Sequence, residues 1–152
     1  MNRRRGFTLI ELLTVVFVLG ILASIALLKY VDLRINAVAA QVVLEMRAVQ
    51  VAALNYYAET ETWPPESGAG AVPAGLGPLL PGQLATSFDR GDYLLDYENF
   101  GAEGSDVIIG VAVTTSNPKL FAKLATYLGG GSPFFVAGSR ITYLIAGPGG
   151  VF

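Results

Sequence analysis

The sequence predicts an α+β fold, in which one long N-terminal α-helix packs on a roughly four-stranded antiparallel sheet with a short inserted helix. Three observations predict this class. The first 60 residues contain no proline and carry helical patterns, residues 59–92 hold 11 glycines and prolines, and alternating or β-branched runs follow. Because the strands come after the helix instead of alternating with helices, the order favours α+β over a parallel α/β sheet.

The long helix is predicted over residues 7–59 and has two different halves. Residues 7–28 hold 17 apolar residues among 22, and at 1.5 Å per residue they form a helix of about 33 Å, enough to cross a bilayer. In residues 31–57 an apolar side chain recurs every three or four positions, which predicts a face packed under a sheet. Trp63-Pro64-Pro65 stops the helix. The apolar face comprises Val31, Ile35, Val38, Val42, Met46, Val49 and Ala53.

Basic residues predict how the apolar segment is oriented in a membrane. Arg3, Arg4 and Arg5 precede it, and only Lys29 directly follows it. Segments rich in lysine and arginine remain in the cytoplasm. We therefore expect a single-pass protein of the inner membrane, with residues 1–6 in the cytoplasm and the head, residues 60–152, outside it.

Within the head, residues 60–92 read as a long surface loop and residues 93–152 as the sheet. Tyr93 to Glu98 alternates apolar with acidic residues, a pattern typical of a half-buried strand. Asn117 and Pro118 supply a helix cap and a first-turn proline, so a short helix is predicted before Gly129-Gly130-Gly131. The remaining strands are predicted at 107–114, 134–137 and 141–146.

Composition excludes most catalytic and metal-binding chemistry. The chain has no histidine and no cysteine, which removes the commonest general base and metal ligand and also every thiolate and disulfide. The net charge of -2 gives no basic footprint for nucleic acid. We predict that the protein is not an enzyme and has neither catalytic residues, nor a metal site, nor a cofactor.

Three short motifs fit plain structure better than chemistry. Ser116 and Lys119 match the spacing of acylating serine enzymes, but their partner motifs are missing and a helix cap explains them. Arg90-Gly91-Asp92 is read as a turn, with an adhesive tripeptide as the alternative. The acidic stretch 89–106 is read as a solvated face, because its spacing is not diagnostic of a calcium site.

Glu11 is the residue that discriminates between interpretations of the N-terminus. A secretory signal ending at Ser24-Ile25-Ala26, a twin-arginine signal at Arg4-Arg5 and an uncleaved anchor all leave this carboxylate unexplained in an apolar segment. Cleavage between Gly6 and Phe7 would place a new, largely protonated α-amino group four residues before Glu11. Glu11 can then pair with its own Phe7 terminus or with that of a neighbouring subunit.

The run Arg5-Gly6-Phe7-Thr8-Leu9-Ile10-Glu11-Leu12 closely resembles the prepilin signature of type IV pilins and type II secretion pseudopilins. The resemblance is strong over about the first 30 residues. It implies a pilin-like fold, cleavage after Gly6 by a prepilin peptidase, N-methylation of Phe7, and assembly of residues 7–28 into the core of a filament. It also implies a platform protein and a cytoplasmic assembly ATPase as partners, in a homo-oligomeric or mixed pilin filament that is periplasmic or on the cell surface.

Two alternatives to a type IV pilus subunit remain. One is a pseudopilin of a type II secretion system, and the other is a membrane-anchored extracytoplasmic binding module that uses the head alone. The chain departs from many pilins in having Leu28 where they have a proline, so we expect the helix to continue there. It also has no acidic residue after Asp106, whereas major pseudopilins usually carry calcium-binding acids near their C-terminus.

Overall fold

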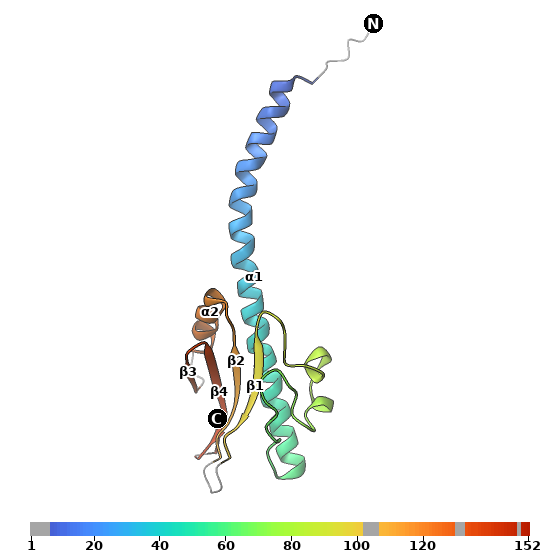
Figure 1. Cartoon of the computed structure of the whole chain (residues 1–152), viewed down its shortest axis with the longest axis vertical. Helices are drawn as coiled ribbons and strands as arrows, with labels where there is room; N and C mark the ends of the chain where they lie inside the picture. Colours follow the sequence, from blue (N-terminus) through green and yellow to red (C-terminus); the bar gives the residue numbers. More distant parts are fainter. Residues whose placement is uncertain (1–6, 102–106, 130–132, 149) are drawn as a thin grey trace. The chain divides into compact units, whose positions relative to one another are not determined.

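The α+β class predicted from the sequence is confirmed by the structure, a computed structural model that describes residues 7–101, 107–129, 133–148 and 150–152 (Figure 1). The chain divides into two compact units, Met1–Ile35 and Asn36–Phe152. The predicted leader, residues 1–6, lies outside the described residues. The elements are α1 (Leu9–Thr60), the 3-10 turns η1 (Gly77–Leu79) and η2 (Gly82–Ala85), β1 (Leu94–Asn99), β2 (Ile109–Thr114), α2 (Pro118–Leu128), β3 (Phe134–Ala137), β4 (Arg140–Gly147) and β5 (Gly150–Val151).

The N-terminal unit is helical from Leu9, and every residue from Phe7 to Arg34 is exposed. The helix runs through Gly20 and through Leu28 without a break, as expected from the absence of proline. It contains an 18-residue window with a mean hydropathy of 2.6 and at most two charged residues. By length and composition, this helix is able to cross a membrane.

The head unit is built on one antiparallel sheet with the strand order β1-β2-β4-β3, and β5 pairs with the end of β4. Gly138 has a φ of 62° in the two-residue turn between β3 and β4, a conformation that favours glycine. The four predicted strands and the inserted helix are present. Strand β5 was not predicted, because two residues are too few to show an alternating pattern.

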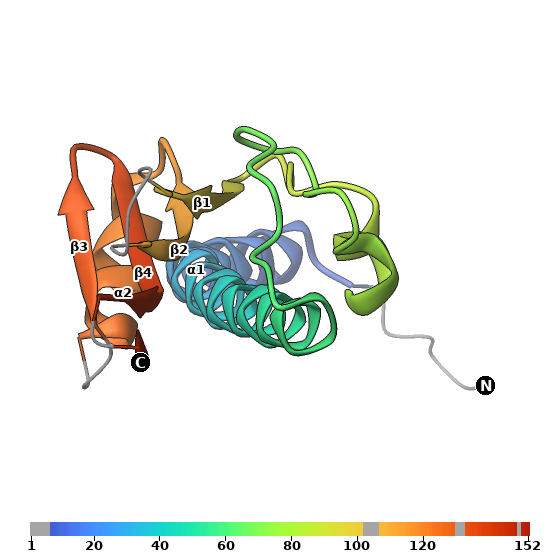
Figure 2. The same cartoon turned by 90° about the horizontal axis from the view of Figure 1, so that it is seen from below.

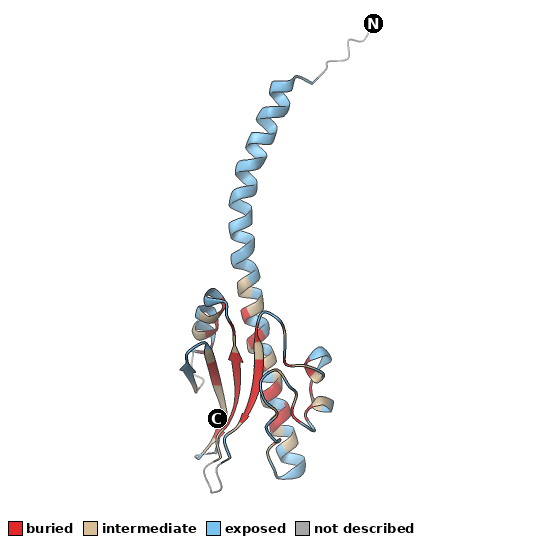
Figure 3. Ribbon diagram, viewed as in Figure 1, coloured by how far each residue is buried: buried red, intermediate tan, exposed pale blue. Residues whose placement is uncertain are grey.

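The core of the head lies between the sheet and the helices. Figure 2 shows the C-terminal part of α1 beneath β1 and β2. Figure 3 shows that this part of the helix contains buried residues. The predicted apolar face is only partly buried, because Val31 belongs to the N-terminal unit and Ile35 and Val38 are half-exposed. Residues of α1 that are fully buried are Ala39, Val42, Met46, Val49, Ala52 and Ala53. The sheet contributes Leu95, Tyr97, Val111, Val113, Ile141 and Ile145, and α2 contributes Leu120, Leu124 and Leu128.

The long loop closes the free edge of β1. The backbone N–H of Gly70 donates to the carbonyl of Leu95 at 2.9 Å, and Leu95 in turn donates to Phe88 at 3.0 Å. Gly75 has a φ of 88°, and a Cβ there would lie 2.5 Å from the Tyr56 ring on α1. Glycine is therefore required where this loop passes the helix. The loop pairs with the backbone of β1 at Leu95 and so covers that part of the strand's free edge.

The packing of α1 gives a matched pair of substitutions in the head. Met46 is 1% exposed, whereas Leu44, two residues earlier on the same helix, is 66% exposed. We expect Met46→Ala to lower the free energy of unfolding of the head by about 2–5 kcal/mol, because it leaves a cavity. Leu44→Ala should change it by less than about 0.5 kcal/mol. Urea titration followed by fluorescence of the single tryptophan checks both values, and equal effects would contradict this packing.

Candidate functional site

The N-terminus of α1 is held by a hydrogen-bonded pair of side chains. The backbone N–H of Thr8 and the Thr8 hydroxyl both donate to Oε2 of Glu11, at 2.9 and 2.7 Å. The backbone N–H of Glu11 donates back to the Thr8 hydroxyl at 3.3 Å. This reciprocal arrangement is a capping box, which satisfies amide groups that the first turn of a helix leaves without partners.

The sequence did not lead us to predict a role for Thr8. The signal that identifies it is the spacing Thr-x-x-Glu directly before an apolar run. The capping box supplies Glu11 with hydrogen-bond donors from its own chain, so the carboxylate is not bare in the uncleaved protein. Pairing of Glu11 with a new Phe7 amino group stays a prediction, since it requires a processed chain.

The predicted processing residues are placed only in part. Phe7 is 74% exposed and lies just before the capping residue Thr8, while Gly6 lies outside the described residues. A cut between them would therefore put the amino group one residue before the helix cap. That position is close to the positive end of the helix dipole, where a carboxylate is favoured and a second positive charge is not. Glu11 is the nearest acidic partner in the sequence.

Replacing Thr8 tests the capping box separately from the charge of Glu11. Thr8→Val keeps the branched shape and removes the hydroxyl, so both bonds that involve this hydroxyl are lost. We expect amide exchange in the first turn of α1 to rise about fivefold, the usual consequence of losing a helix cap. Thr14→Val is the control, because the Thr14 hydroxyl donates to the Glu11 carbonyl within the helix and caps nothing. Unchanged exchange in Thr8→Val would contradict the cap.

The remaining polar side chains of the apolar half are satisfied inside the helix. The hydroxyls of Thr14 and Ser24 donate to the carbonyls of Glu11 and Ile21, at 2.9 and 2.7 Å. Such internal bonds are what a segment in lipid requires. All of the large apolar side chains from Phe7 to Leu28 are about half exposed or more, so this surface needs lipid or other apolar helices as its surroundings.

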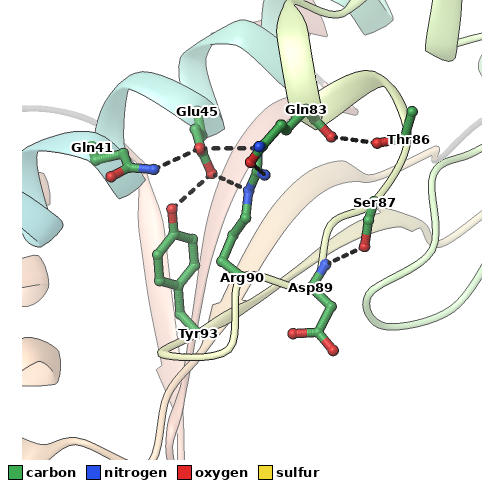
Figure 4. Close-up of polar contacts among 8 residues, drawn as sticks. All are labelled: Gln41, Glu45, Gln83, Thr86, Ser87, Asp89, Arg90 and Tyr93. Atoms are coloured by element: carbon green, nitrogen blue, oxygen red, sulfur yellow. Dashed lines mark hydrogen bonds and ion pairs between the residues drawn. The ribbon is translucent and has the colours of Figure 1, made fainter.

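A polar cluster on the head, drawn in Figure 4, joins the long loop to α1. Arg90 donates to Glu45 of α1 and to Gln83, each at 3.3 Å, and the hydroxyl of Tyr93 donates to Glu45 at 2.8 Å. Burial and the neighbouring Glu45 carboxylate raise the pKa of Tyr93 well above its ordinary value. The Arg90 side chain is only 13% exposed, so Arg90-Gly91-Asp92 is not presented as an adhesive tripeptide.

A second cluster corrects part of the predicted solvated acidic face, residues 89–106. Asp89 and Asp92 are exposed as predicted, and Glu103 and Asp106 lie outside the described residues, but two acids are buried. Asp96 and Glu98 on β1 are 6% and 5% exposed, and both pair with Arg140 of β4; the distance from Arg140 Nη2 to Asp96 Oδ2 is 2.7 Å. The alternating pattern implied that these carboxylates would face water, but the guanidinium lets them be buried. Among the described residues, no group of three or more acidic side chains is placed to hold a metal ion.

Comparisons with known proteins find a family motif in the N-terminal segment and several similar proteins. The family model for the prokaryotic N-terminal methylation motif matches residues 1–27. The chain is 39% identical over 69 residues to the type IV major pilin protein PilE1 of Neisseria gonorrhoeae, which covers 45% of this chain and 32% of the relative. It is 34% identical over 71 residues to the fimbrial protein EcpC of Eikenella corrodens, covering 47% and 46%.

A third relative has a related name. The chain is 40% identical over 52 residues to a probable minor fimbrial protein of Dichelobacter nodosus, covering 34% of this chain and 33% of the relative. The chain thus matches less than half of the length of these curated relatives. No solved structure shows a significant match to it.

Proposed function

We propose that this chain is a structural subunit of a type IV pilus-like filament, since its N-terminal segment carries the prokaryotic methylation motif and the chain is similar to type IV pilins. The observation that carries the proposal is the methylation motif over residues 1–27, together with an apolar helical segment in which every residue from Phe7 to Arg34 is exposed. Named relatives that are pilins and fimbrial proteins support it further.

In this proposal the subunit is first inserted into the inner membrane as a precursor. Residues 7–28 span the bilayer, the basic residues Arg3 to Arg5 keep the leader 1–6 in the cytoplasm, and the head lies outside. A prepilin peptidase cuts between Gly6 and Phe7, and Phe7 is N-methylated. A platform protein and a cytoplasmic ATPase then move the subunit from lipid into a filament of pilin subunits, which extends into the periplasm or from the cell surface.

Glu11 is proposed to set the register between subunits. In a filament the apolar helices exclude water from one another, so an unpaired carboxylate there is costly. The protonated Phe7 terminus of the same or a neighbouring subunit supplies the opposite charge. A pair of this kind is stronger in apolar surroundings than in water. Where it joins Glu11 of one subunit to Phe7 of a neighbour, it forms only when the two helices are at one axial offset.

The names of the relatives favour a pilus over a type II secretion pseudopilus. All three relatives described above are pilins or fimbrial proteins by name. The methylation motif by itself is compatible with both assemblies, because pseudopilins have the same signature. A binding module that uses the head alone would leave the methylation motif without a purpose.

The test is to find the chain in filaments. Surface filaments are sheared from cells that produce the chain with a short epitope at its C-terminus, sedimented, and examined by immunogold microscopy. We expect the label along the filaments, and the chain in the sedimented fraction at the mobility of the processed form. A chain that stays entirely in the membrane fraction of cells that do make pili would overturn the proposal.

A further inference from the structure

Two buried carboxylates share one guanidinium on the side of the sheet that carries Asp96. Asp96 and Glu98 are both more than nine-tenths buried, while the side chain of Arg140 is 34% exposed. The Nη2 atom of Arg140 contacts both Oδ2 of Asp96 and Oε1 of Glu98. The second oxygen of Asp96, Oδ1, is buried and has no hydrogen-bond partner among the residues that the structure describes. With both acids ionised, the three side chains together carry a net charge of about −1, because one guanidinium neutralises only one carboxylate.

The register of the sheet explains why the three side chains meet. Asp96 lies opposite Ala112 of β2, and Glu98 lies opposite Gly110. Arg140 of β4 lies opposite Thr114, on the other edge of β2. Because the residues between the acids and the arginine are small, the long guanidinium side chain can reach across β2 to β1. A Cβ at Gly110 would lie 3.0 Å from both the Thr142 methyl and the Tyr143 carbonyl, so any larger residue would force these neighbours to move.

We propose that Asp96, Glu98 and Arg140, here called the clasp, form a proton-binding cluster. It takes up one proton on acidification and thereby strengthens the side-chain contact between β1 and β4. At neutral pH both carboxylates are ionised, and burying their uncompensated negative charge costs free energy. Once a proton enters, one carboxylate pairs with Arg140 and the other becomes a neutral acid whose O–H donates a hydrogen bond. The proton belongs to the pair of acids and not to either one alone.

The surrounding charges agree with this direction. Burial is the largest cause that raises the pKa of Asp96, Arg140 opposes it, and the carboxylate of Glu66 raises the pKa further. Glu66 comes from the long loop, where its Oε2 accepts the backbone N–H of Asn99 at 3.0 Å. Among the described residues, the charged groups that face Asp96 are thus Glu98 of its own strand, Arg140 of β4 and Glu66 of the loop.

The sign of the pH effect follows from this raised pKa. Because the folded chain holds the proton more tightly than the unfolded chain, the stabilisation is complete below the ordinary pKa of the acid. It is lost as the pH rises through the higher value of the folded state. Most proteins behave in the opposite way, since their paired carboxylates have lowered pKa values and acid weakens them. The clasp should therefore oppose acid unfolding of the head.

The first test compares unfolding of the full chain in neutral detergent micelles with that of Asp96→Asn. Urea unfolding of the head is followed by the fluorescence of Trp63, which stacks on Tyr57 with a centroid distance of 4.5 Å. From about pH 7.5 to about pH 4.5, the ratio of the unfolding constants of wild type and Asp96→Asn should fall about threefold or more. The matched control is Glu59→Gln, which removes one exposed carboxylate from α1 outside the clasp, and its ratio should stay constant.

A second measurement needs no variant. In a 13C titration of the carboxyl carbons of the wild-type chain in micelles, at least one of Asp96 and Glu98 should titrate above the ordinary range of exposed acids. The proposal is overturned if both titrate at or below that range, or if the ratio for Asp96→Asn is flat or rises on acidification. Neither test depends on filament assembly, so failure of the proposed function would leave them unaffected.

Discussion

Replacing Glu11 by valine is expected to leave the chain in the membrane and to remove it from filaments. Valine is easier to insert into a bilayer than a carboxylate, so the amount of membrane-bound precursor should be unchanged or higher. At each contact between subunits, however, the charged partner of the Phe7 terminus is missing. Loss of a charge-assisted hydrogen bond in apolar surroundings weakens a contact by about tenfold or more. Sheared filaments, quantified by immunoblot against the membrane fraction, give the result.

Glu11→Gln separates the two roles that the structure allows for this residue. Glutamine can still accept the two hydrogen bonds of Thr8 in the capping box, but it has no charge to neutralise an amino group. We expect Glu11→Gln to assemble as poorly as Glu11→Val. Ser24→Val is the control, because its hydroxyl only donates to Ile21 of its own helix, and it should assemble normally. Normal assembly of Glu11→Gln would show that Glu11 serves the helix cap alone.

Replacing Arg140 by methionine is expected to cause one of the largest losses of stability in the head. Methionine keeps much of the packing of the side chain but leaves Asp96 and Glu98 buried without a cation. Breaking a buried ion pair from one side costs about 3–5 kcal/mol. Because Arg140 is partly exposed, we expect about 2–4 kcal/mol at neutral pH, reduced by solvent screening. Urea titration of the full chain measures the loss.

The control for Arg140→Met is Lys123→Met, which removes an exposed cation from α2. It should alter the free energy of unfolding by less than about 0.5 kcal/mol. Acidification should restore part of the stability of Arg140→Met, since protonated acids tolerate burial without a partner cation better than carboxylates do. If Arg140→Met unfolds at the urea concentration of Lys123→Met, the buried ion cluster contributes nothing to the fold.

Local patterns explain which parts of the fold were predicted from the sequence. The periodicity of α1, the run of β-branched residues in β2 and the Asn117-Pro118 start of α2 each lie within a few neighbouring residues. The structure bears out the cap of α2, where the Asn117 side chain accepts from the backbone N–H groups of Lys119 and Leu120. Such elements are fixed by signals that a single segment carries.

The buried acids could not be predicted in this way. Asp96 and Arg140 are separated by 44 residues, and their contact depends on the order of three strands and on two small residues in β2. An acidic residue in an alternating strand is normally a sign of the solvent face, and nothing near Asp96 in the sequence signals a partner. The capping box is a different case, because its Thr-x-x-Glu spacing is a local signal from which it could have been predicted. Glu11 was interpreted through its charge alone.

The chemical state of the N-terminus is decisive for the proposed assembly, because every role proposed for Glu11 in assembly depends on a free amino group at Phe7. The measurement is the intact mass and N-terminal sequence of the chain purified from a host with an active prepilin peptidase. We expect a chain that lacks residues 1–6 and begins with N-methylated phenylalanine. A chain that retains Met1, or one that begins at Leu27 after signal peptidase cleavage, would contradict it.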